Sequence, residues 1–73
     1  MGREFPLINI VLNGESKEIP EGLTLLQLVE WLKLPSDRVA VERNRKIVHR
    51  REWEAARVET GDRLEIVHFV GGG

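Results

Sequence analysis

The sequence predicts an α+β fold in which a mixed sheet of four to five strands carries one helix packed across one face. Two observations support this prediction. Two short hairpin patterns lie on either side of a single amphipathic helix pattern, and a further strand pattern follows them, which gives the order β-β-α-β-β-β. Short hairpins that flank one helix favour an α+β sheet over a doubly wound sheet, in which strands alternate with helices.

The first hairpin is expected near the start of the chain. Residues 7–12 are dense in β-branched side chains, and their alternation would place three apolar side chains on one face of a strand. The pair Asn13-Gly14 is a strong turn signal because both residue types tolerate a positive φ. A short return strand is expected at residues 17–19, and Pro20 is expected to end it.

The helix pattern is the clearest in the chain. Thr24 is a predicted N-cap, and Gln27 three residues later completes a capping box. Four apolar residues follow at the spacing of one buried stripe: Leu25, Leu28, Val29 and Leu32. Pro35 is expected to end the helix, because the residue before a proline is biased out of the helical conformation. Three further apolar residues widen the stripe into a partly exposed flank: Leu26, Trp31 and Leu34.

The second hairpin and the last strand complete the sheet. Strands are expected at residues 39–42 and 46–48, and the last and longest strand is expected at residues 64–70, with Leu64 and Ile66 facing the helix. The segment that crosses to this strand is expected to hold at most one helical turn. Three apolar residues are expected to pin it: Trp53, Ala56 and Val58. The complete order matches the β-grasp architecture.

Length and composition limit the function classes. We expect one domain over residues 1–73, with a flexible extension at residues 1–6 and a mobile tail at residues 71–73. A net charge of -1 and the absence of a long apolar run predict a cytoplasmic protein that binds neither nucleic acid nor membrane. The chain has no cysteine, and His49 and His68 lack nearby spaced ligands, so no metal site is expected.

The second hairpin and the segment after it concentrate positive charge. Five basic residues form this run: Arg43, Arg45, Lys46, Arg50 and Arg51. We interpret the run as a solvated face, with contact to an acidic partner as the alternative. Nucleic acid is disfavoured because no aromatic side chains are interleaved with the basic ones.

The end of the chain carries the strongest functional signal, because an apolar strand pattern runs directly into Gly71, Gly72 and Gly73. Glycines past a strand have no side chains to pack, so we expect a thin thread that presents the ionised carboxylate of Gly73. Gly71 and Gly72 would lie extended in a channel of a partner protein. There the carboxylate would reach a buried nucleotide, as acyl activation requires. The alternative is a frayed tail or a linker without function.

The residues just before the glycines are predicted to bind the same partner. Val67 and Phe69 alternate onto the face of the sheet that the helix does not cover, and Val70 leads from them into the tail. Apolar residues exposed beside a functional chain end favour a docking role. The alternative is that Phe69 folds over the sheet edge and packs on Trp53.

Four stretches point to a known family. They are VAVERN at residues 39–44, IVHR at 47–50 with the following Trp53, GDRLEIV at 61–67 and VGGG at 70–73. With these stretches the chain resembles the ThiS family of sulfur carrier proteins from the thiamine pathway, and the likeness covers nearly all of the chain from Ile8 onward. The chain departs from the family at two positions, since the family often has proline in place of His49 and glycine in place of Arg45.

The resemblance implies a defined role for the chain end. Gly73 would be adenylated by a ThiF-like enzyme that uses ATP and Mg²⁺, and then converted to a thiocarboxylate with sulfur from a sulfur-donor protein. The sulfur would pass to a ThiG-like thiazole synthase. The chain itself would bind no cofactor and would be a protein substrate, not an enzyme. The alternatives are a molybdopterin synthase small subunit (MoaD-like) with the same tail chemistry, and a ubiquitin-like interaction or modifier module.

Overall fold

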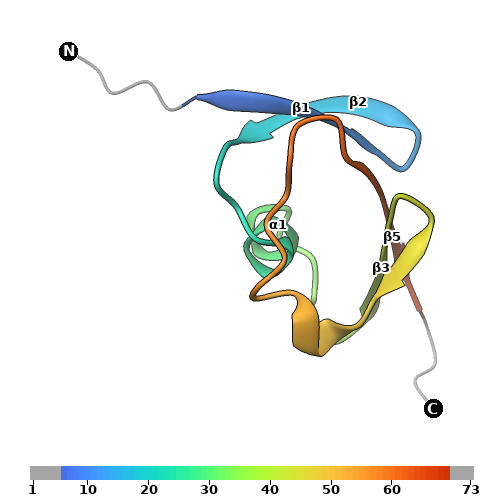
Figure 1. Ribbon diagram of the computed structural model, residues 1–73. Helices are drawn as coiled ribbons and strands as arrows, with labels where there is room; N and C mark the ends of the chain where they lie inside the picture. The colour runs from blue at the N-terminus through green and yellow to red at the C-terminus, as the bar shows by residue number, and fades with distance from the viewer. Residues whose placement is uncertain (1–5, 70–73) are drawn as a thin grey trace.

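The computed structural model describes residues 6–69 and contains one α-helix and five strands in the predicted order (Figure 1). The elements are β1 (Leu7–Leu12), β2 (Glu15–Pro20), α1 (Leu25–Trp31), β3 (Val39–Arg43), β4 (Lys46–Val48), the 3₁₀-helix η1 (Arg50–Glu52) and β5 (Arg63–His68). The short η1 confirms that the crossing segment holds a single helical turn. The expectations for residues 1–5 and 70–73 lie outside the described residues.

The five strands form one mixed sheet in the order β2-β1-β5-β3-β4. The β1–β5 pair is parallel, and the other three pairs are antiparallel. The last described strand, β5, therefore lies in the middle of the sheet, between the two hairpins. The sheet curves around α1, which lies on one side of it (Figure 1). This arrangement confirms the predicted α+β fold, with one helix across one face of a mixed sheet.

The two ends of α1 have different causes. The predicted capping box is present, because the Thr24 hydroxyl accepts from the Gln27 amide and the Gln27 side chain accepts from the Thr24 amide. The predicted end is wrong, since the helix stops at Trp31 and Pro35 does not terminate it. Lys33 adopts a φ of 61°, and its amide and that of the next residue donate back to carbonyls in the last turn at 2.9 and 3.1 Å. This is a Schellman motif with lysine at the position that usually holds glycine.

The core lies between α1 and the sheet. Its buried apolar side chains are Ile10, Ile19, Leu25, Leu28, Val29, Val39, Val41, Trp53, Val58, Leu64 and Ile66. Leu64 and Ile66 therefore face the helix side as predicted. Trp53 is 2% exposed, and its indole N–H donates to the Val48 carbonyl at 3.0 Å, so it pins the crossing segment as expected. The predicted flank of α1 is partly exposed at Trp31, and the Lys17 ammonium lies 5.8 Å from the centre of its ring.

Two strands differ in length from their predictions. β2 covers six residues instead of three, because the antiparallel ladder with β1 continues from Leu12↔Glu15 to Leu7↔Pro20. β5 also has six residues, the same number as β1 and β2, so the prediction that it is the longest strand is wrong for the described part of the chain. It ends at His68, and Phe69 lies just outside it.

Arg45 lies in the β3–β4 turn with a φ of 74°, next to Asn44 with a φ of 51°. A side chain with a Cβ is strained in this left-handed conformation by about 1–2 kcal/mol. We expect Arg45→Gly to raise the free energy of unfolding by about 0.5–1 kcal/mol, since the greater freedom of glycine in the unfolded chain offsets part of the gain. Thermal unfolding followed by circular dichroism measures the change. Lys46→Gly, at the neighbouring position without a positive φ, should destabilise the fold, and a loss of stability in Arg45→Gly would contradict the strain.

Candidate functional site

The predicted functional residues lie at and beyond the end of β5. The structure places Val67 and Phe69 on the sheet surface, with 58% and 48% of their areas exposed. Leu64 and Ile66 alternate with them and are buried. Two of the predicted partner-binding residues are therefore accessible on the face away from α1. Val70 and the three glycines, including Gly73, lie outside the described residues.

The surroundings of Phe69 bear on its two predicted roles. Its amide donates to the Arg38 carbonyl at 3.0 Å, which continues the β3–β5 ladder by one residue past the strand. Its side chain is about half exposed, while Trp53 is enclosed in the core. The side chain of Phe69 therefore presents apolar area to solvent beside the start of the tail.

The β1–β2 turn holds β5 in place on one side. The Asn13 backbone N–H donates to the Leu64 carbonyl at 2.9 Å. The Asn13 side chain then accepts from the Ile66 N–H at 2.8 Å and donates to the Ile66 carbonyl at 3.2 Å. One amide side chain thus continues the strand pairing where β1 has already turned away. Sequence reasoning assigned Asn13 only to a turn, because this pairing spans 53 positions of the chain.

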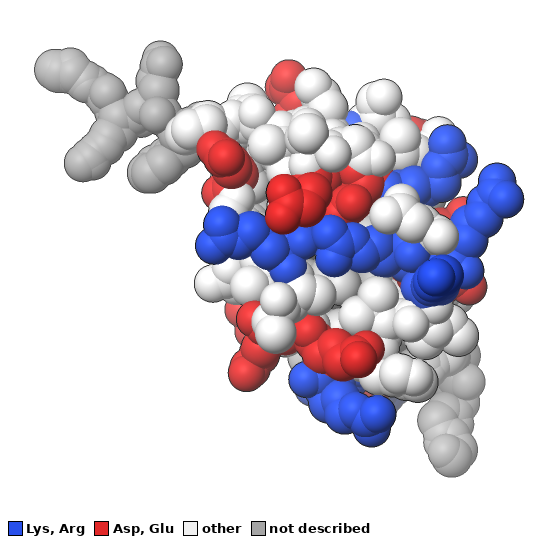
Figure 2. Space-filling view, viewed as in Figure 1, with Lys and Arg blue, Asp and Glu red and all other residues white. Residues whose placement is uncertain are grey.

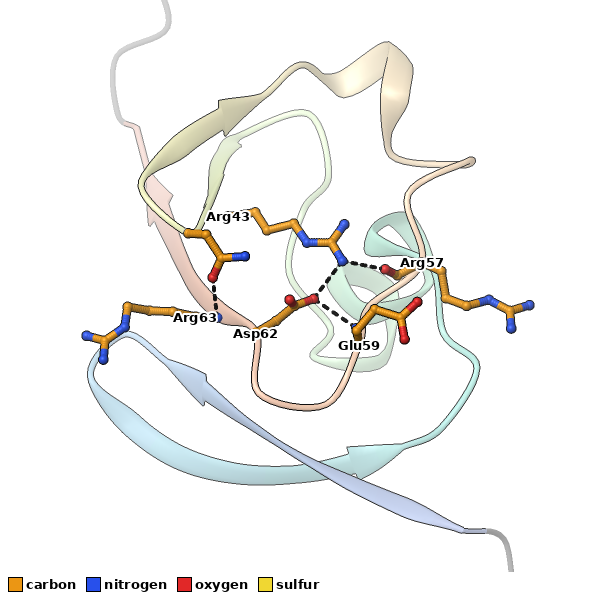
Figure 3. Close-up of polar contacts among 6 residues, drawn as sticks. Arg43, Arg57, Glu59, Asp62 and Arg63 are labelled. Carbon is orange, nitrogen blue, oxygen red and sulfur yellow. Dashed lines mark hydrogen bonds and ion pairs between the residues drawn. The ribbon is translucent and has the colours of Figure 1, made fainter.

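A buried carboxylate fixes the start of β5 (Figure 3). Asp62 is 7% exposed, and its Oδ2 lies 2.8 Å from both the Arg43 guanidinium and the Glu59 backbone nitrogen, which donates to it. The Arg43 guanidinium also donates to the Arg57 carbonyl at 2.8 Å. The interpretation of Arg43 as part of a solvated face is therefore wrong, because this side chain joins β3, the crossing segment and the turn before β5. The sequence carries the Gly61-Asp62 turn but no signal for its partner.

Basic and acidic side chains lie next to one another on the face of the molecule drawn in Figure 2. Figure 2 shows a band of Lys and Arg side chains across one face, with Asp and Glu side chains on both sides of it. Within the predicted basic run, Arg50 donates to the Ser36 hydroxyl at 3.3 Å. Such mixed charge supports the interpretation of an ordinary solvated surface for the exposed members of the run.

Two kinds of feature are absent from residues 6–69. Over residues 6–69, no group of three or more His, Asp or Glu side chains is placed to hold a metal ion. Within the same range, no helix has the length and apolar character needed to cross a bilayer. What the geometry provides is a central strand that is held at its start by Asp62 and along its length by Asn13 and β3. The position at which the chain leaves this strand is therefore fixed relative to the rest of the fold.

Comparisons with known proteins agree with this geometry. The ThiS family model matches residues 10–73. The sulfur carrier protein ThiS of Bacillus subtilis is 38% identical over 50 residues, which cover 68% of this chain and 76% of that protein. A crystal structure of the thiamine biosynthesis protein ThiS from Geobacter metallireducens superposes with a TM-score of 0.80 at 32% identity, and covers 90% of this chain and 100% of that one.

Longer proteins also contain a similar segment. A thiazole synthase of Paramagnetospirillum magneticum is 41% identical over 66 residues, which are 90% of this chain. The match covers 20% of that protein. The chain therefore spans about a fifth of the length of the thiazole synthases that it matches.

Proposed function

The chain belongs to the ThiS family, and we propose that it is a sulfur carrier of thiamine biosynthesis whose Gly73 carboxylate is adenylated and then converted to a thiocarboxylate. The observation that carries the proposal is the family match, which runs to the final glycine on a fold whose last described strand is central and anchored. The names of the Bacillus and Geobacter relatives support the same pathway.

The proposed chemistry requires of the carrier only that its C-terminal carboxylate extends into the active site of the adenylating enzyme. An oxygen of the Gly73 carboxylate attacks the α-phosphate of ATP, pyrophosphate leaves, and an acyl adenylate forms. A ThiF-like enzyme supplies the Mg²⁺ and the cationic groups that stabilise the developing charge. Sulfur from a donor protein then bonds to the acyl carbon, and AMP leaves. The carrier is the substrate in both steps, and no cofactor is bound to it.

The proposed sulfur acceptor is a ThiG-like thiazole synthase. Two thiazole synthases each contain a segment that is similar to this chain and makes up about a fifth of their length. This similarity supports the choice, since the segment and the rest of the thiazole synthase belong to one polypeptide. A molybdopterin synthase small subunit with the same tail chemistry is the alternative.

The mass of the intact protein tests the proposal. The chain is incubated with a ThiF-like enzyme, ATP, Mg²⁺ and a sulfur source, and replacement of one oxygen by sulfur adds about 16 Da at the carboxylate. Isopeptide conjugation would instead give a series of larger species, which would indicate a ubiquitin-like modifier. An unchanged mass in the presence of an active enzyme would contradict the proposal.

We propose that Phe69 contacts the adenylating enzyme next to the channel of that enzyme that receives the glycine tail. Because Phe69 is 48% exposed outside the core, Phe69→Asp should leave the melting temperature nearly unchanged. We expect binding to the enzyme to weaken about 10-fold or more, since a charge would replace an apolar anchor. Titration calorimetry measures the binding, and Trp31→Asp, exposed on the helix side, is the matched control. Unfolding of Phe69→Asp would instead support its packing over the sheet edge.

A further inference from the structure

The two sides of β5 are paired to different extents. On the β3 side the antiparallel ladder continues as far as His68. On the β1 side the parallel ladder ends at Leu12↔Leu64, because the chain then enters the β1–β2 turn. Among the described residues, the part of β5 beyond Leu64 therefore has a neighbouring strand on one side only. Backbone N–H and C=O groups that point to the other side need a different partner.

The side chain of Asn13 is that partner. It accepts from the Ile66 N–H at 2.8 Å and donates to the Ile66 carbonyl at 3.2 Å. Ile66 is 8% exposed, so the two backbone groups lie beside the core, where an unpaired polar group is costly. One planar amide thus pairs with Ile66 as a residue of a neighbouring strand would.

The conformation of the β1–β2 turn holds the Asn13 amide in place. Asn13 has a φ of 51° and Gly14 a φ of 84°, and two successive residues with positive φ are typical of a tight hairpin turn. The Asn13 backbone N–H donates to the Leu64 carbonyl at 2.9 Å. The backbone and the side chain of one residue therefore bond two positions of β5 that lie next to each other on the same side.

The second hairpin places a matching asparagine at the other end of β5. Asn44 also has a φ of 51°, its backbone N–H donates to the Arg63 carbonyl at 2.8 Å, and its side-chain oxygen accepts from the Arg63 N–H at 3.1 Å. The two asparagines differ in the part of β5 that they bond. Asn44 bonds the first residue of the strand, whereas Asn13 bonds Ile66, which lies three residues before Phe69 at the end of the described chain.

We propose that Asn13 is a positioning residue for sulfur loading, because it keeps the end of β5 in the sheet and so fixes the point from which the glycine tail extends. The proposal rests on the proposed function, since it concerns delivery of the Gly73 carboxylate. Asn13 acts through β5 and contacts no reacting atom. Without its amide, the end of β5 would be held by β3 alone and would open more often.

The expected size of the effect follows from the length of chain that opening releases. Opening back to Ile66 would roughly double the number of residues between the sheet and Gly73. A flexible connection that is twice as long brings its end to a given point about 3-fold less often. Loading should therefore become slower at the step that follows docking.

The test compares Asn13→Gly with Asn44→Gly in the full chain. Each substitution keeps a residue type that adopts a positive φ and removes one side chain that bonds β5. Single-turnover loading is measured with saturating ThiF-like enzyme, ATP, Mg²⁺ and a sulfur source, at a temperature at which circular dichroism shows all three proteins to be folded. We expect the saturated rate to fall about 3-fold in Asn13→Gly and to stay at the parent value in Asn44→Gly. The enzyme concentration that gives half of the saturated rate should be the same for all three.

Amide hydrogen exchange followed by NMR shows whether the end of β5 opens. Phe69 donates to the Arg38 carbonyl and Val67 lies opposite Ala40, so the amides of Phe69 and Val67 face β3 and do not bond Asn13. In Asn13→Gly both amides should exchange about 10-fold faster than in the parent, and in Asn44→Gly neither should change.

Asn13→Asp is the conservative variant. It keeps an acceptor for the Ile66 N–H and loses the donor to the Ile66 carbonyl, so half of the pairing remains. Its loading rate and its exchange rates should lie between those of the parent and those of Asn13→Gly.

The outcomes separate the positioning role from the carrier function. If the parent is loaded and Asn13→Gly keeps its saturated rate or its exchange rates at Val67 and Phe69, the positioning role is overturned and the carrier function stands. Equal losses of rate in Asn13→Gly and Asn44→Gly would indicate general destabilisation and would also overturn it. A higher half-saturating concentration with an unchanged saturated rate would make Asn13 a docking contact instead. If the parent itself gains no sulfur, both proposals fail.

Discussion

Gly72→Val should fold as the parent does and should fail to accept sulfur. The buried side chains of the described core all come from residues 10–66, so the substitution changes none of them. In the proposed mechanism the tail lies extended in a closely fitted channel, and a branched side chain one residue before the carboxylate would displace the reacting oxygen. A displacement of about 1 Å can cost about 100-fold in rate. The initial rate of mass gain in the loading reaction measures this loss.

The same substitution at the other end of the chain supplies a control for Gly72→Val. Gly2→Val adds an identical side chain far from the tail in sequence and should be loaded at the rate of the parent. Circular dichroism should give superimposable spectra and equal melting temperatures for all three proteins. Loading of Gly72→Val at the rate of the parent would show that the channel tolerates a Cβ at this position, and the steric explanation of the terminal glycines would then be wrong.

Local patterns predicted the fold well, because each depends on residues close together in the chain. The capping box joins Thr24 and Gln27, which are three residues apart, and the structure contains both of its hydrogen bonds. The apolar stripe of α1 and the alternation in β5 likewise follow from the geometry of a helix and a strand. The sheet order is different, since the parallel contact between β1 and β5 joins the two ends of the described chain and leaves no local signal.

The features that the sequence did not predict share one physical cause. In each of them a residue acts through a partner far away in the chain, or through a backbone conformation that is unusual for its type. Lys33 ends α1 in a left-handed conformation that sequence rules assign to glycine. Asn13 pairs with Ile66 across the fold. Glu42 lies opposite Glu65 only through the register of β3 with β5. The sequence alone named the candidate residues. The pairing register of the strands was needed to show which residues lie opposite one another.

Asp62→Ala is expected to have the largest effect on stability among the polar residues. Asp62 is buried, and its removal leaves the Arg43 guanidinium without its anion and the Glu59 N–H without its acceptor. Losing charge-assisted hydrogen bonds of this kind costs about 2–3 kcal/mol. A domain of this size has a stability margin of only a few kcal/mol, so the melting temperature should fall by roughly 10 °C or more. Urea unfolding measures the free energy directly.

The comparison variants show which contact carries that cost. Asp37→Ala removes an exposed carboxylate from the connector after α1 and should change stability little. Asp62→Asn retains an acceptor for the Glu59 N–H but not the charge, so it should lie between the parent and Asp62→Ala. Arg43→Met in the Asp62→Ala background should cost less than in the parent, because the cation has already lost its partner. Additive losses would mean that the ion pair does not couple β3 to the turn, and that packing around the turn alone holds β5 at its start.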